Sequence, residues 1–287
     1  MSLALNEEQR ILKESADAFF ASQAPVSALR RLRDEQDPRG FCPDLWRSMV
    51  DMGWAGTFLP EQYGGLGCGF RELGVVMEAG GRTLAASPLF SSIVLGASCV
   101  LLAGTEAQKS DLLPALAGGE LLLALALQES PHYRPGDVAT SATAEGDGFR
   151  ISGRKVHVID GHCADRFIVA ARTAPAEAAP DGISLFLVDT AAPGVGAQRR
   201  IMVDSRNMAE VSFDDVRVEA GALLGPLHGG GALLERVVDR GNIALAAEML
   251  GCALEAFERT LDYLRTRQQF GAYIGTFQAL QHRAAQM

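Results

Sequence analysis

The chain has 287 residues, 48% of them hydrophobic and 21% charged, which suits a globular protein of two or three domains. Its formal net charge of -9 argues against binding to nucleic acid through bulk electrostatics. The five cysteines are scattered without a C-x-x-C pair, the longest apolar run covers residues 121–127, and the amino terminus opens on acidic residues. We therefore expect no metal site, no membrane span and no signal peptide, and a cytoplasmic location.

Residues 1–119 are predicted to form an all-helical domain. Asn6 can cap a first helix, and helices are expected over residues 44–52, 70–80, 87–102 and 106–116. The charged stretch 30–39 is expected to face water. Residues 59–67 form a glycine-rich loop that could be taken for a phosphate cradle, but it lacks the Lys-Ser/Thr of a P-loop and no strand precedes it.

Residues 120–228 are predicted to form a β domain, because the hydrophobic period there changes from 3.6 to 2. Residues 121–128 suggest a strand buried on both faces, and residues 145–148 a hairpin turn between strands 139–144 and 149–151. Further strands are expected over 155–159, 166–171, 183–188 and 210–213, with an exposed loop over 175–182. Short strands without helices between them favour a β-sandwich or β-barrel.

Residues 229–287 begin with the longest predicted helix, residues 232–266. Its apolar residues, from Ile243 to Leu264, alternate steps of four and three, which is typical of a four-helix bundle. Only the start of a second bundle helix follows, so we expect a C-terminal part beyond Met287 to be missing from the chain. Between the two helices, Gly271 and Gly275 mark a turn.

The turn at the end of the long helix has two interpretations. On spacing alone it is an ordinary helix hairpin with a basic turn. Arg267, Phe270 and Gln278 can also converge on one side, and a guanidinium, an aromatic face and an amide suit a pyrophosphate and an adenine.

The string R-x-Q-F-G-x-x-I-G-x-F-Q-x-x-Q-H, which starts at Arg267, closely resembles the signature of the acyl-CoA dehydrogenase family. The P-E-x-Y-G-G loop from Pro60 and the F-D-D-V-R-V segment from Phe213 also resemble family landmarks. The resemblance covers the whole chain. It implies an α+β multidomain fold, with an all-α N-terminal domain, a β middle domain and the start of a C-terminal four-helix bundle.

The resemblance also implies a chemistry. Such enzymes bind FAD and an acyl-CoA, and they remove the α-hydrogen as a proton and the β-hydrogen as a hydride. The product is a 2-enoyl-CoA, and the electrons pass to an electron-transfer flavoprotein. Arg267, Phe270 and Gln278 are then expected to reach the FAD of a neighbouring subunit in a homo- or hetero-tetramer. Leu127 and Arg240 are expected to contact the substrate.

Two flavin-binding segments depart from the family pattern. The family's T-E-P appears as Gln128-Glu129-Ser130, and its W-x-T-N appears as His157-Val158-Ile159-Asp160. We expect Gln128, Glu129, His157 and Ile159 to border the flavin. Gln128 can hydrogen-bond its pyrimidine edge, whereas Ile159 has no donor for N5. His157 either covers the ring or is an ordinary strand histidine.

The catalytic base is left unassigned. The family carries it either on a late C-terminal helix, outside this chain, or at the position of Gly241, which has no acid–base group. Asp239 and Glu248 lie on the same helix, but helical charges are usually solvated or paired. Arg240 either faces the thioester and flavin or pairs within its own helix.

In these departures the chain resembles the small subunit of pimeloyl-CoA dehydrogenase and subunits of heteromeric sterol side-chain dehydrogenases. In such assemblies, unlike subunits share an active site. Three functions stay open: an FAD-dependent acyl-CoA dehydrogenase, a non-catalytic subunit that completes a partner's FAD site, and a flavin oxidase or monooxygenase of the same fold.

Overall fold

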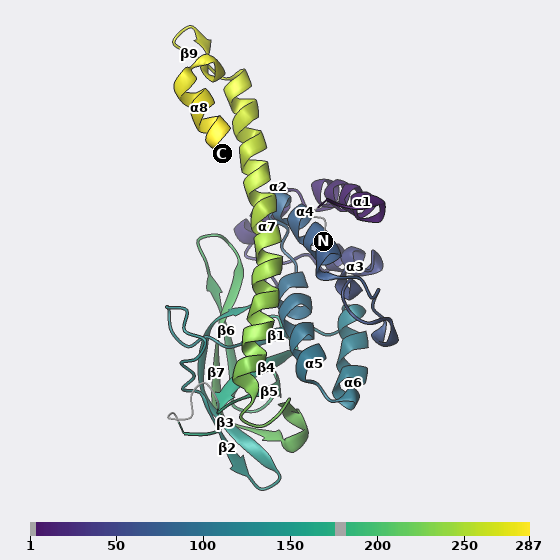
Figure 1. The fold of residues 1–287 in the computed structure, drawn as a ribbon. Coiled ribbons are helices and arrows are strands. Elements are labelled where there is room, and N and C mark those ends of the chain that lie inside the picture. The colour runs from purple at the N-terminus through teal and green to yellow at the C-terminus, as the bar shows by residue number, and fades with distance from the viewer. Residues whose placement is uncertain (1–3, 176–181) are drawn as a thin grey trace.

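The computed structural model describes residues 4–175 and 182–287. A helical N-terminal part lies beside a sheet-rich middle part, and one long helix, α7, runs along both and projects beyond them (Figure 1). The loop predicted over residues 175–182 and the first three residues of the chain lie largely outside the described residues. Among the helices of the described residues, none combines the length and the apolar character needed to cross a bilayer.

The N-terminal part is helical, as predicted. Asn6 caps the first helix by accepting a 2.8 Å hydrogen bond from the Gln9 amide, and Thr105 caps the last one in the same way at 3.2 Å. The helix expected over residues 87–102 is divided into η3, which is wound as a π-helix, and a short α-helix. The helices are α1 (Glu7–Gln23), α2 (Val26–Asp34), α3 (Pro43–Asp51), α4 (Phe70–Thr83), η3 (Leu89–Ala97), α5 (Ser98–Ala103) and α6 (Glu106–Ala117).

The glycine-rich loop is not a phosphate cradle. The amides of Gly65, Leu66 and Gly67 donate to the carbonyls of Pro60, Gly56 and Leu59, at 2.9–3.2 Å. A phosphate cradle needs free amides, so this loop serves to close the chain between η2 (Glu61–Tyr63) and α4.

The middle part is one mostly antiparallel sheet with two open edges. One arm runs β6 (Val195–Ile201), β7 (Asn207–Glu219), β3 (Gly148–Ile159) and β2 (Ser141–Glu145). The other contains β4 (Arg166–Arg172), β5 (Ile183–Asp189) and β8 (Leu223–Leu224), with β1 (Leu123–Ala126) parallel to β4. The arms meet where Ser141 of β2 pairs with Arg172 of β4.

The sheet folds over so that its two arms pack face to face. The rings of Phe149 and Phe186 lie 4.9 Å apart, and those of Phe167 and Phe213 lie 6.0 Å apart. Because β6 and β8 have free edges, the domain is sandwich-like and the barrel alternative is wrong. The α+β prediction itself is confirmed.

Strand β6 was not predicted and β7 is longer than predicted. Most of the side chains of β6 are at least partly exposed, so the strand has no alternating apolar pattern that sequence reasoning could detect. It forms because seven consecutive residues pair with β7.

Helix α7 (Gly230–Thr266) is the longest element, as predicted. Apart from Gly230 at its start, its buried residues are Leu234, Val237, Gly241, Ala244 and Gly251, on the face that meets α4, α5 and η3. The predicted bundle seam lies largely outside this face: Ile243 and Leu250 are 57% and 50% exposed. A hairpin at its end leads through β9 (Gln268–Gln269), β10 (Ala272–Tyr273) and η6 (Ile274–Thr276) to α8 (Gln278–Gln286).

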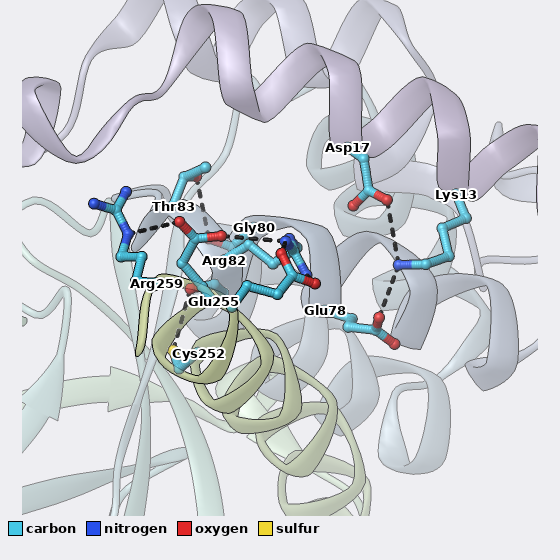
Figure 2. A network of polar contacts seen from close by, with 11 residues as sticks. Lys13, Asp17, Glu78, Gly80, Arg82, Thr83, Cys252, Glu255 and Arg259 are labelled. Carbon is cyan, nitrogen blue, oxygen red and sulfur yellow. Dashed lines mark hydrogen bonds and ion pairs between the residues drawn. The ribbon is translucent and has the colours of Figure 1, made fainter. Parts of the chain in front are cut away.

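The crossing of α4 and α7 depends on two glycines. A methyl group at Gly81 would lie 2.1 Å from the Glu248 carbonyl oxygen, and one at Gly251 would lie 1.9 Å from that of Glu78. Around this contact Arg82 pairs with the carboxylates of Glu255 and Glu258, and the Cys252 thiol donates to the Gly81 carbonyl at 3.2 Å (Figure 2). Partly exposed ion pairs of this kind stabilise a fold by only about 0–1 kcal/mol each. The close backbone approach therefore sets the position of α7.

Candidate functional site

Gln128 and His157 form one polar edge at the end of β1. The Gln128 carbonyl accepts a 2.7 Å hydrogen bond from the Val156 amide, and a bulge in β3 between Lys155 and Val158 turns His157 outward with φ of 52°. Gln128 Nε2 donates to the Ser130 carbonyl at 2.8 Å and lies 3.3 Å from His157 Nδ1. The structure therefore brings together two of the predicted flavin neighbours.

Glu129 supports this edge from inside the protein. Its carboxylate accepts hydrogen bonds from Lys155 Nζ at 2.7 Å and from the amides of Ala139 and Thr140 at 2.7 and 2.9 Å. Burial opposes ionisation, but Lys155 and these amides hold the pKa of Glu129 below its usual range. The Glu129 carboxylate thus already accepts three hydrogen bonds from its own chain, and its contact with the flavin stays a prediction.

Lys155 of β3 is fully buried and holds the segment that contains Leu127 and Glu129. Besides Glu129, its Nζ donates to the Leu127 carbonyl at 3.1 Å. Burial lowers the pKa of Lys155 to about 8, against the opposing effect of Glu129, so the amine is still charged at neutral pH. The side chain of Leu127, predicted to contact substrate, is buried in the core that the helices share with β1.

Ile159 borders a cavity of about 460 Å³ between the helices and the sheet. Its neighbour Asp160 lines the same cavity and is buried, with Oδ2 accepting a 2.6 Å hydrogen bond from Ser91 Oγ. Burial raises the pKa of Asp160 to about 6, although Ser91 and Asn207 oppose the shift. Sequence reasoning gave Asp160 no role, because nothing local indicates that a carboxylate at the end of a strand is buried.

Arg240 does not pair with a described carboxylate of its own helix, and its contact with the thioester or flavin side stays a prediction. Its guanidinium lies 5.4 Å from the centre of the Phe70 ring and 3.4 Å from Ser98 Oγ, so it faces α4 and α5. It forms no ion pair with a carboxylate of the described residues, and burial together with Arg236 lowers its pKa.

Gly241 is buried where α7 meets η3. A methyl group there would lie 2.8 Å from Leu95 Cδ2, so a glutamate at this position would have to displace Leu95. Asp239 is exposed, and Glu248 forms an ion pair with Arg206. None of these three positions therefore presents an unpaired carboxylate within the cavity.

The hairpin at the far end of α7, drawn with β9 and α8 in Figure 1, contains Arg267, Phe270 and Gln278. All three are exposed, and Phe270 reaches 93% with φ of 54°. Arg267 follows Gly241 by 26 residues, a rise of roughly 39 Å at 1.5 Å per residue of helix. One chain therefore carries two separate groups of predicted cofactor contacts, and its own fold does not bring them together.

Both groups have the chemistry that FAD needs. Gln128 Oε1 makes no hydrogen bond within the described part of the chain and can accept one from a ligand. At the hairpin, an exposed guanidinium and an exposed aromatic face suit a pyrophosphate and an adenine.

Three family models match this chain in order. They are the N-terminal domain of acyl-CoA dehydrogenase over residues 6–120, the middle domain over residues 132–216 and the C-terminal domain over residues 228–287. A probable acyl-CoA dehydrogenase of Bacillus subtilis is 31% identical over all of this chain and 76% of its own length.

Solved structures agree with this assignment. A steroid acyl-CoA dehydrogenase titled Tcur3481-Tcur3483 is 35% identical, with a TM-score of 0.84 over 97% of this chain and 72% of that one. The ChsE4-ChsE5 complex of Mycobacterium tuberculosis is 26% identical, with a TM-score of 0.87 over 100% and 74%. A solved structure named for the electron transferring flavoprotein of Acidaminococcus fermentans is 27% identical. Its TM-score is 0.89, over 100% of this chain and 76% of that one. This chain belongs to the acyl-CoA dehydrogenase family, whose members are FAD-binding oxidoreductases.

Proposed function

We propose that this protein is a subunit of an FAD-dependent enzyme that oxidises an acyl-CoA thioester to the 2-enoyl-CoA and passes the electrons to an electron-transfer flavoprotein. The separation of its two groups of cofactor contacts carries the proposal. Because Arg267 lies roughly 39 Å along α7 from Gly241, the hairpin group serves the FAD of a neighbouring subunit, while Gln128 and His157 border the chain's own FAD. The enzyme is then an oligomer, proposed here as a homo- or hetero-tetramer in the cytoplasm.

Each side chain has a task in this arrangement. Arg267 binds the pyrophosphate, Phe270 packs against the cofactor and Gln278 hydrogen-bonds it. The amide of Gln128 holds the pyrimidine edge, and His157 covers the ring from the bulge in β3. When bound, FAD supplies the hydride acceptor. Lys155 and Glu129 keep the Gln128 segment in place through the bonds to Leu127, Ala139 and Thr140.

The proton-accepting base is proposed to come from outside the described residues. Gly241 has no acid–base group, Glu248 is paired with Arg206, and Asp160 is bonded to Ser91. A carboxylate from a partner subunit or from a C-terminal segment would have to enter beside Gly241.

Two residues favour a second function. Ile159 offers no donor to flavin N5, and Gly241 has no acid–base group. In this alternative the chain is a non-catalytic subunit, and its hairpin completes the FAD site of an unlike partner. The ChsE4-ChsE5 complex and the paired names of the steroid enzyme, Tcur3481-Tcur3483, support a heteromeric assembly. A steroid, as in the name of that enzyme, is one candidate for the acyl group.

The visible spectrum of the purified protein, with released FAD quantified per chain, tests both functions. About one FAD per chain, bleached anaerobically by members of an acyl-CoA panel, supports the dehydrogenase. A colourless protein that gains FAD only when co-expressed with a partner supports the helper subunit. Flavin reduction that is followed by stoichiometric oxygen consumption would instead indicate an oxidase and contradict the proposed electron acceptor.

A further inference from the structure

The cavity beside Ile159 has two chemically different ends. The apolar walls come from the helices and include Phe20, Met49, Val76, Met77, Leu89 and Phe90. The polar wall comes from the ends of β3 and β7 and from one turn of α7, and consists of Asp160, Asp204, Ser205, Arg206, Asn207 and Glu248. The cavity volume of about 460 Å³ falls in the range of roughly 300–1,000 Å³ that is usual for small-molecule sites.

One end of this cavity lies between Ile159 and Gly241, where the flavin and the reacting carbons of the acyl group are expected. Ile159, the residue at the proposed N5 position, lines it, and so does Leu245, one turn beyond Gly241 on α7. Phe90, also in the lining, lies 3.8 Å from where a Cβ of Gly241 would be. An acyl group held between Ile159 and Gly241 would therefore extend into this space and reach the polar wall with its far end.

The polar wall is acidic. It contains three carboxylates, those of Asp160, Asp204 and Glu248, and one guanidinium, that of Arg206. Arg206 is already engaged, because it pairs with Glu248 and lies 5.8 Å from the centre of the Phe90 ring. Arg199 approaches the wall from behind and is engaged as well, because it donates to Asn207 Oδ1 at 2.9 Å and to the Asp37 carbonyl. Within the described residues, a second anion would therefore meet three carboxylates and two guanidiniums that already have partners, which disfavours a substrate that ends in a carboxylate.

Hydrogen-bond acceptors remain available on this wall. Asp160 Oδ2 accepts from Ser91, and a carboxylate has room for about four hydrogen bonds in all. The Ser205 hydroxyl is a further polar group in the lining. A hydroxyl on an otherwise apolar body would satisfy these acceptors without adding charge, and sites that bond a hydroxyl reject analogues that lack it.

We propose that the substrate is a hydrophobic acyl-CoA that carries a hydroxyl group at the end remote from the thioester, and that Asp160 and its neighbours on the polar wall bind this hydroxyl and exclude a terminal carboxylate. The inference rests on the proposed function, since it assumes that the acyl group enters this cavity.

The test compares three thioesters of equal chain length on the FAD-loaded enzyme, with its partner subunit where FAD binding requires one. These are an alkanoyl-CoA, the corresponding ω-hydroxyacyl-CoA and the corresponding ω-carboxyacyl-CoA. We expect kcat/KM to be highest for the hydroxyacyl-CoA and lower by about tenfold or more for the carboxyacyl-CoA, since tenfold corresponds to only about 1.4 kcal/mol. A carboxyacyl-CoA turned over as well as the hydroxyacyl-CoA would overturn the inference.

Two variants locate the effect. Asp160→Asn removes a carboxylate and Glu248→Gln releases Arg206, so each should raise the ratio of carboxyacyl to hydroxyacyl turnover by about tenfold. Asp147→Asn, on the exposed β2–β3 turn where Asp147 pairs with Arg217, is the matched control and should leave the ratio unchanged. FAD content and melting temperature are measured for each variant, so that a folding defect in one leaves the other as the test.

The outcomes separate this inference from the proposed function. If no acyl-CoA of any kind bleaches the flavin, the proposed function fails. If alkanoyl-CoA bleaches it but the ratio does not move in either folded variant, only the assignment of the polar wall fails.

Discussion

Replacing Gly251 with alanine tests whether the α4–α7 crossing positions the active-site helix. The added methyl group would lie 1.9 Å from the Glu78 carbonyl oxygen, 2.9 Å from its carbon and 3.0 Å from the Arg82 amide nitrogen. All three atoms belong to the backbone of α4, so no side chain can rotate away. Reaching ordinary contact, which begins near 3.4 Å, requires the two helices to separate by about 1.5 Å.

The magnitude follows from two opposing effects. Overpacking in a close-packed interior costs about 1–3 kcal/mol, and more where rigid groups clash. Alanine is the better helix former by about 1 kcal/mol, which offsets part of that cost. We expect a net loss of about 2 kcal/mol, or a fall in Tm of roughly 4–8 °C for a chain of 150–250 residues and less for a longer one.

Gly74→Ala is the matched control, because Gly74 lies in the middle of α4 and faces α7 in the same crossing. A methyl group at Gly74 meets only the Ala247 side chain, at 3.7 Å, which is ordinary contact. This variant should melt at or slightly above the parent temperature in a thermal denaturation followed by circular dichroism. The double variant Gly81→Ala with Gly251→Ala should cost less than the sum of the two single ones, because one separation relieves both clashes. Equal melting of Gly251→Ala and Gly74→Ala would refute the reasoning.

Three further predictions concern the site. Lys155→Met leaves the partly buried Glu129 carboxylate without its cation and should lower the free energy of unfolding by about 3–5 kcal/mol, seen as a lower Tm. Glu129→Gln should restore part of this loss in the double variant, and an unchanged Tm would contradict the internal pairing. Because the folded pKa of Asp160, about 6, lies above its ordinary value of 3.8, the stability that its protonated form contributes is present below pH 4 and is lost as pH rises through 6. Asp160→Asn should therefore gain stability over the parent by up to about 3 kcal/mol between pH 4 and pH 8, whereas a pH-independent difference in Tm would count against a buried, titrating carboxyl. Arg267→Ala should lower FAD content at least about tenfold in the assembled enzyme without lowering the Tm of the cofactor-free subunit, because the side chain is exposed on its own chain, and Arg283→Ala on α8 should do neither.

Much of the fold could be predicted from the sequence because its signals are local. The change of hydrophobic period near residue 120 separates the helical from the sheet-rich part, and Asn6 and Thr105 cap the helices that they precede. The string that starts at Arg267 identifies the family and hence the cofactor. Strand β6 could not be predicted, because its stability comes from pairing with β7 and its own side chains carry no apolar alternation.

The order of the elements, the family and a set of residues that could meet FAD all follow from the amino-acid sequence alone. Only the folded chain shows which groups surround those residues. It withdraws the Glu129 carboxylate into a bond with Lys155, turns Arg240 toward Phe70, and buries Asp160 against Ser91. These outcomes depend on contacts between segments 26 to 170 residues apart, whose burial and pairing no local pattern encodes.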